Sequence, residues 1–247
     1  MKSLEITELC KDFEDSHVLR NINFQIAAGE FVVVMGQSGC GKSTLLYCVS
    51  GMDSVTSGEV KLNGQTLSTL PEKEVEKLRL LHMGFIFQKA NLMKNLTIVD
   101  NITFPAFQLG KESREEILEN AERLMQKMGI LSVAKSDIRR VSGGQLQRAA
   151  ICRAMINKPD ILFGDEPTGA LNSSATKDVM DILTGINRDG TTIMLVTHDA
   201  KVAAKADRII YLEDGRMKDE LRLGKYWEKD LQQREDRLKG WLLEMGF

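Results

Sequence analysis

The eight residues 36–43 read GQSGCGKS, which is the spacing G-x-x-x-x-G-K-S. They follow the apolar run FVVVM at 31–35 and precede a helical pattern that starts at Lys42. Glycines in such a loop let successive backbone N–H groups turn inward around phosphate oxygens, and the next helix points its positive N-terminal end at them. We expect Lys42 to contact the β and γ phosphates of a nucleotide and the Ser43 hydroxyl to bind Mg²⁺.

The rest of this loop is expected to act mainly through its backbone, so that its cysteine needs no reactive role. The residues expected to contact the phosphates are Gly36, Ser38, Gly39, Cys40, Gly41, Lys42, Ser43 and Thr44.

Acidic residues that complement this loop follow another apolar run, in ILFGDEPTGALN at 161–172. Asp165 is placed to complete the metal shell, and Glu166 to polarise an attacking water as a general base. Ligands of parallel sheets bind at the carboxyl ends of the strands, which favours a site over an ordinary solvated loop. TIMLVTHDA at 192–200 ends a further apolar run with His198, a candidate sensor of the γ phosphate.

Two kinds of strand are expected to position these residues. The runs at 31–35, 84–87, 161–163, 192–197 and 208–212 are continuously apolar, which is typical of strands buried on both faces of a parallel sheet. The runs at 4–9, 22–26 and 59–64 alternate, as half-buried antiparallel strands do. Between Gln88 and Pro159 the pattern is helical, with a capping box at Ser113 and Glu116 and a stop at Gly129.

Composition excludes several other classes of protein. The 247 residues carry a net charge of −2 with both signs interspersed, which counts against nucleic acid as the main partner. No apolar run reaches the roughly 18 residues of a membrane span, and the N-terminus alternates instead of forming a signal peptide. The 4 cysteines have no C-x-x-C pair, so we expect free thiols and neither a disulfide framework nor a zinc site.

These motifs together resemble the nucleotide-binding subunits of ATP-binding cassette (ABC) transporters over about residues 1–220. The loop at 36–44 resembles the Walker A motif, and ILFGDEP at 161–167 resembles the Walker B strand with its glutamate. The other matching motifs are the Q-loop with Gln88, the signature VSGGQLQR with Ser142, Gly143, Gly144 and Gln145, the D-loop ALN at 170–172, and the switch histidine His198 in VTHD.

The resemblance implies an ATP hydrolase that uses ATP and Mg²⁺. Glu166, His198 and Gln88 would act in hydrolysis, and Ser43, Gln88 and Asp165 would hold the metal. Phe13 stands where the family places an aromatic ring that stacks on adenine; a core aromatic beside a strand is the alternative interpretation.

The signature also explains two glycines at the start of a helix, where each costs about 0.5–1 kcal/mol relative to alanine. Ser142 and Gln145 have capping-box spacing, which leaves Gly143 and Gly144 unexplained. In the family two subunits pair head to tail, and the signature of one covers the ATP in the Walker A loop of the other. The bare glycine amides would then approach the γ phosphate, and we expect a homodimer in which each site uses both chains.

Two positions depart from the family pattern. The signature begins with Val141 where leucine is usual, an exchange between apolar residues. Asn172 replaces the usual D-loop aspartate, which puts the communication between the two sites in doubt.

The expected fold class is α/β: a P-loop NTPase (RecA-like) core with an antiparallel β subdomain and an inserted α-helical signature subdomain. Residues 1–224 would form the ATPase domain, with the core at 1–88 and 160–220 and the helical subdomain at 89–159.

Residues 225–247 would be a C-terminal helical extension. Its apolar residues recur near one helical face that Arg234 interrupts, which favours a helix folded back on its own domain over contact with a partner subunit or a membrane surface. The apolar residues of that face are Trp227, Leu231, Leu238, Trp241, Leu242 and Met245.

Residues 84–111 are similar to the branch that contains lipoprotein-release, macrolide-export, cell-division and peptide-antibiotic-detoxification ATPases. We therefore expect a cytoplasmic ATPase, peripheral on the membrane, that powers a separate integral membrane permease for export or extraction of a peptide, antibiotic or lipophilic substrate. One alternative is an ATPase whose membrane partner transmits force without moving solute. A soluble cassette of DNA repair or translation is disfavoured because the sequence has neither a long coiled-coil insertion nor a second cassette.

Overall fold

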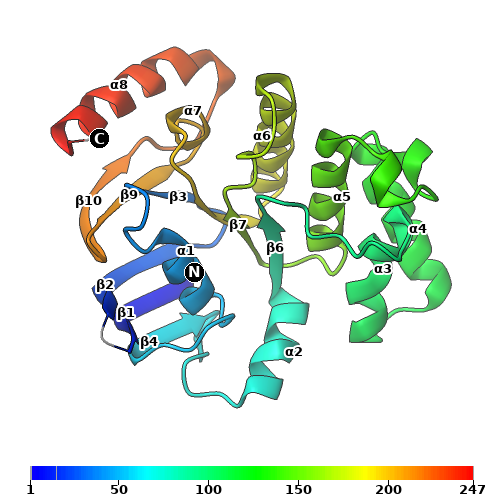
Figure 1. Ribbon diagram of the computed structural model, residues 1–247, viewed down its shortest axis with the longest axis horizontal. Coiled ribbons are helices and arrows are strands. Elements are labelled where there is room, and N and C mark those ends of the chain that lie inside the picture. The colour runs from blue at the N-terminus through cyan, green and yellow to red at the C-terminus, as the bar shows by residue number, and fades with distance from the viewer. Residues whose placement is uncertain (1, 15, 247) are drawn as a thin grey trace.

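Two β-sheets organise the part of the chain that the computed structural model describes, residues 2–14 and 16–246 (Figure 1). The larger sheet has six strands in the order β10-β9-β3-β8-β7-β6, and the smaller has four in the order β2-β1-β4-β5. The strands of the larger sheet are β3 (Phe31–Met35), β6 (Met83–Phe87), β7 (Ile161–Asp165), β8 (Thr192–Val196), β9 (Arg208–Glu213) and β10 (Arg216–Arg222). Those of the smaller sheet are β1 (Lys2–Phe13), β2 (Ser16–Ala27), β4 (Ser57–Leu62) and β5 (Gln65–Thr66).

The larger sheet brings the ends of its parallel strands to one edge. Strands β9, β3, β8, β7 and β6 are parallel, and β10 pairs antiparallel with β9. Phe87 at the end of β6 pairs with Asp165, and Asp165 pairs with Val196 of β8. The loops that follow these strands therefore start side by side, at the edge where parallel sheets bind ligands.

Continuous apolarity in the parallel strands follows from burial on both faces. Every residue of β3 is buried, and alternate residues enter different cores. Val32 and Val34 join the core between the two sheets, which also contains the buried side of α1 (Lys42–Val49), whereas Val33 joins the core under the helices. The smaller sheet is antiparallel, and the buried residues of β2 are separated by more exposed ones. The α/β fold class predicted from the sequence is confirmed.

Three α-helices and two short 3-10 helices lie between β6 and β7 in the chain, and the α-helices gather on one side of the molecule beyond the β6 edge (Figure 1). The long helices are α2 (Glu72–His82), α3 (Ile98–Leu109), α4 (Arg114–Lys127), α5 (Gly143–Met155), α6 (Ser173–Arg188) and α8 (Leu231–Glu244), with the short α7 (Ala200–Ala203) before β9. The predicted capping box of Ser113 and Glu116 begins α4, although Leu118 in its apolar pattern is exposed. The division into core and helical subdomain stays a prediction.

The C-terminal helix α8 folds back onto the chain's own core, beside α7 and β10 (Figure 1). Leu238, Trp241 and Leu242 are buried in the core under the helices, and the indole of Trp241 donates to Asp219 at 2.8 Å. Trp227, by contrast, is 58% exposed, because the helix begins only at Leu231 and helical spacing does not reach it.

Arg234 does not break the buried face of α8; it is part of that face. Its side chain is buried, and its guanidinium donates to the carbonyls of Ala204, at 2.7 Å, and of Ala206. It also donates to three carbonyls at residues 223–225. One guanidinium thus donates to the carbonyls of two separate backbone segments.

In the described part of the chain, no helix combines the length and the apolarity that crossing a bilayer requires.

Candidate functional site

Glycines shape the loop between β3 and α1. A Cβ on Gly36 would lie 2.1 Å from the carbonyl oxygen of Leu212, so the strand end and the loop can approach only without a side chain. Gly41, at the start of α1, has φ of 101°, which L side chains rarely adopt. The backbone of the loop can therefore follow the tight path that the phosphate-binding motif requires.

Lys42 folds back over this loop. Its buried ammonium donates to the carbonyls of Gly36 and Gln37, each at 2.8 Å. A cavity of about 490 Å³ opens at this point, lined by Val18, Ser38, Gly39, Gly41, Lys42, Ser43, Thr44, Glu166 and His198. Burial raises the pKa of the neighbouring Cys40 thiol, an effect that Lys42 opposes only in part, so the thiol stays protonated at neutral pH.

Asp165, at the end of β7, is held by two hydroxyls of α1. The Ser43 hydroxyl donates to its Oδ1 at 3.0 Å, and the Tyr47 hydroxyl donates to its Oδ2 at 2.8 Å. Burial, followed by the hydrogen bond to Asp165, raises the pKa of Tyr47 to about 12, so this hydroxyl keeps its proton at neutral pH. Ser43 and Asp165 were predicted from the sequence, whereas Tyr47 was not.

The oxygen donors here fit Mg²⁺, which prefers oxygen ligands and is often held by one carboxylate together with substrate phosphates. Ser43 and Asp165 supply a hydroxyl and a carboxylate next to the phosphate loop. Among the described residues, no cluster of three or more His, Cys, Asp or Glu side chains is placed to hold a metal ion.

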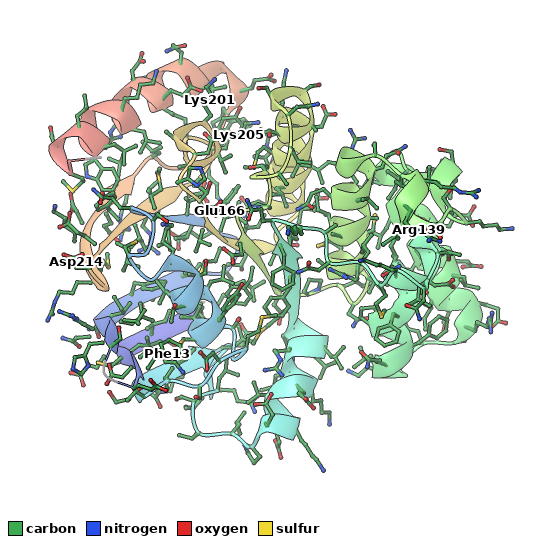
Figure 2. The ribbon with its side chains drawn as sticks, in the orientation of Figure 1. Phe13, Arg139, Glu166, Lys201, Lys205 and Asp214 are labelled. Carbon is green, nitrogen blue, oxygen red and sulfur yellow. The ribbon has the colours of Figure 1, made fainter. Side chains whose placement is uncertain are left out.

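Glu166 and His198 form a pair at the same edge of the sheet. Nδ1 of His198 lies 2.7 Å from Oε1 of Glu166, and both residues line the phosphate cavity. Glu166 has φ of 44°, which is unusual for a residue other than glycine. Figure 2 shows Glu166 in the middle of the molecule, after the end of β7.

Gln88 joins this pair from the end of β6. A Cβ built on Gly169 would lie 2.8 Å from Nε2 of Gln88 and 3.2 Å from Oε2 of Glu166. Both side chains therefore lie against the bare backbone of Gly169. Of the three residues predicted to act in hydrolysis, the structure thus brings Gln88 and His198 each next to Glu166.

The signature residues lie on a separate surface. Ser142 and Gln145 form the predicted capping box at the start of α5, with the Gln145 amide donating to Ser142 Oγ at 3.3 Å. Gly143 and Gly144 leave this end of the helix bare, and a cavity of about 750 Å³ adjoins it. This cavity and the phosphate cavity share no lining residue, so in one chain the two halves of the predicted site do not meet.

Comparison with known proteins agrees with this geometry. A family model described as ABC transporter matches residues 19–169. The lipoprotein-releasing system ATP-binding protein LolD of Leptospira interrogans is 40% identical over 215 residues, which cover 87% of this chain and 90% of LolD. The chain belongs to the family of ABC transporter ATP-binding domains.

Another relative within this ABC family is longer. The macrolide export ATP-binding/permease protein MacB of Mannheimia succiniciproducens is 42% identical over 224 residues, covering 89% of this chain and 35% of MacB. The chain thus spans about a third of the length of this relative. Among solved structures, a dimeric bacterial ABC transporter cassette aligns with a TM-score of 0.84 at 36% identity, over 90% of this chain and 100% of that one. A dimeric ATP-binding cassette in a post-hydrolysis state, bound to ADP and phosphate, gives 0.83 at the same 36% identity.

This ABC domain is accordingly an ATP hydrolase. Two residues that the motifs single out, Asn172 and Phe13, make contacts within their own chain. The carboxamide oxygen of Asn172 accepts from the Ala175 amide at 2.9 Å and caps α6, so the D-loop residue has a structural partner within its own chain. Phe13 is 47% exposed, with Lys11 Nζ at 4.6 Å from its ring centroid. It lies on the smaller sheet and outside the residues that line the phosphate cavity, and stacking on adenine stays a prediction (Figure 2).

Gln147 of α5 is a further site residue that the sequence did not single out. Its buried Nε2 donates to the carbonyl of Phe87 at 2.9 Å and to that of Pro167 at 2.7 Å. The signature helix is therefore hydrogen-bonded to the residues next to Gln88 and next to Glu166. The only signal in the sequence is a second glutamine two positions after Gln145.

Proposed function

We propose that two copies of this chain close head to tail around two ATP molecules and that hydrolysis drives a separate membrane permease. The observation that carries the proposal is the cavity in which the phosphate loop, Lys42, Ser43, Glu166 and His198 converge. Its independence from the signature surface supports the dimer, because each chain would supply the half that the other lacks.

In this proposal the loop amides and Lys42 bind the β and γ phosphates, and the Ser142 hydroxyl with the Gly143 and Gly144 amides covers the γ phosphate from the second copy. Glu166 orients the attacking water and accepts its proton, while His198 holds the Glu166 carboxylate through its Nδ1. The new bond joins the water oxygen to the γ phosphorus, and the bond from that phosphorus to ADP breaks.

Mg²⁺, when bound, neutralises charge on the β and γ phosphate oxygens. Ser43, Asp165 and Gln88 would hold it. Closure of the dimer excludes bulk water from the phosphates, so a single copy should hydrolyse ATP poorly.

The permease would dock in a second cavity, next to the Q-loop. This cavity of about 490 Å³ lies between α2, β6, α3 and α5, with Phe85, Phe87, Pro105 and Arg153 in its wall. Phe104 and Phe107, which flank Pro105 on the same helix α3, are 40% and 45% exposed. Docking there would place the chain at the cytoplasmic face of the membrane and couple Gln88 to the movement of the permease.

Glu166→Gln tests the catalytic proposal. Loss of the base should slow hydrolysis by about 100-fold or more, because general-base catalysis contributes on that order. ATP binding should persist, so that the variant accumulates as a dimer in size-exclusion chromatography with ATP and Mg²⁺. Glu122→Gln, an exposed glutamate of α4, is the matched control and should behave as wild type. A Glu166→Gln variant that stays active or monomeric would contradict the proposal.

Export or extraction is the class of transport that the relatives favour, since those compared are named for macrolide export and for lipoprotein release. Reconstitution with the permease in vesicles tests this. ATP-dependent movement of a peptide, antibiotic or lipid-linked substrate is expected; ATP turnover without movement of any of them would instead favour a partner that only transmits force.

A further inference from the structure

Two hydroxyls lie one turn apart on the same face of α1 and hold the two oxygens of one carboxylate. Ser43 and Tyr47 are four residues apart, the spacing that places helical side chains above one another. Ser43 donates to Oδ1 of Asp165 at 3.0 Å and Tyr47 to Oδ2 at 2.8 Å. With both oxygens held, the carboxylate cannot turn about its Cβ–Cγ bond without losing a hydrogen bond.

The ring and the backbone of Tyr47 are also fixed. Its ring packs against the core between the two sheets. Its carbonyl accepts from the amides of Met52, at 2.9 Å, and Asp53, at 3.1 Å, which fix the end of α1. The side chain therefore spans from an anchored backbone to Asp165 with little freedom to move.

We propose that Tyr47 is a positioning residue that orients Asp165 for the divalent cation of the nucleotide site. The inference rests on the proposed function, because it gives Asp165 the role of metal ligand. The neutral Tyr47 hydroxyl fixes the Asp165 carboxylate and leaves its negative charge available to the metal. A lysine or arginine at this position would neutralise that charge. The Ser43 hydroxyl would also bind the metal through its oxygen, whereas the Tyr47 hydroxyl has only the role of holding Asp165 in this proposal.

Tyr47→Phe is the decisive variant, because it removes the hydroxyl and keeps the ring in the core. Hydrogen-bond partners of metal ligands typically change metal affinity by about 10–100-fold. We expect Mn²⁺, used as the paramagnetic probe, to bind about tenfold more weakly to the protein saturated with a non-hydrolysable ATP analogue, measured by electron paramagnetic resonance. Affinity for the analogue in EDTA should stay within about twofold of wild type, since Lys42 and the loop amides are untouched.

Two further variants separate orientation from packing. Tyr226→Phe removes a tyrosine hydroxyl in the tail, and we expect its Mn²⁺ affinity to match wild type. Tyr47→Leu removes ring and hydroxyl together, and we expect its Mn²⁺ affinity to fall at least as far as that of Tyr47→Phe, with an added loss of thermal stability.

The inference is overturned if Tyr47→Phe binds Mn²⁺ like wild type, or if its affinity for the analogue in EDTA falls as much as its metal affinity. If Tyr47→Phe binds Mn²⁺ normally and Tyr47→Leu binds it weakly, the ring of Tyr47 contributes by packing and its hydroxyl does not orient Asp165. A wild-type protein that binds neither Mn²⁺ nor the analogue would instead contradict the proposed function, so the two failures are distinguishable.

Discussion

Gly169→Ala should slow ATP hydrolysis without harming the fold. The new Cβ would lie 2.8 Å from Nε2 of Gln88 and 3.2 Å from Oε2 of Glu166, against an ordinary contact of 3.4 Å or more. Both neighbours are the far ends of flexible side chains, and the glycine does not have a positive φ, so the backbone accepts the change. Gln88 must move by about half an ångström. Because a misplacement of about 1 Å can cost roughly 100-fold, we expect turnover to fall about tenfold.

Steady-state ATP hydrolysis and thermal unfolding measure the two halves of this prediction. Turnover should drop while the unfolding midpoint and the affinity for ATP stay near wild type. Gly185→Ala is the matched control: nothing lies within 4 Å of its ideal Cβ, and alanine in a helix interior adds about 0.5–1 kcal/mol of stability. Turnover of Gly169→Ala within twofold of the control would refute the assigned geometry of Gln88, and a large loss of stability would refute the claim that the fold tolerates the change.

Two other substitutions probe the cap of α6 and the tail. Asn172→Ala should cost about 1 kcal/mol in urea unfolding because the Ala175 amide loses its acceptor, whereas Asn172→Asp keeps the cap; equal stability of the two variants would exclude the capping role. Arg234→Met should cost about 3 kcal/mol or more in the same assay, since it leaves several buried carbonyls, among them those of Ala204 and Ala206, without their donor. A loss under about 1 kcal/mol would show that water replaces the guanidinium.

Local signals in the sequence predicted most of the fold. The run FVVVM is β3 to the residue, because a strand buried on both faces has no reason to alternate. The capping boxes at Ser113 and Ser142 begin α4 and α5, since a cap is formed by residues three apart in the chain. The phosphate loop is equally local, and its Lys42 and Ser43 line one cavity, while their contacts with phosphate and metal stay predictions.

Contacts between distant segments could not be predicted in this way. Tyr47 looks like a core aromatic in the sequence, and only the meeting of α1 with β7, 118 positions along, gives its hydroxyl a hydrogen-bond acceptor. Arg234 looks like an interruption because its partners are carbonyls of two other segments, and backbone acceptors leave no trace in side-chain patterns. Gln147 was missed for the same reason.

The left-handed backbone conformation of Glu166 affects which substitutions this position can accumulate. Holding a glutamate at φ of 44° costs on the order of 1 kcal/mol relative to a residue that accepts the left-handed region. Asparagine or glycine at this position would make the chain more stable and remove the base. Mutants selected for folding alone should therefore lose this carboxylate early. Retaining Glu166 keeps the chain less stable than these mutants, and selection for hydrolysis is needed to retain it.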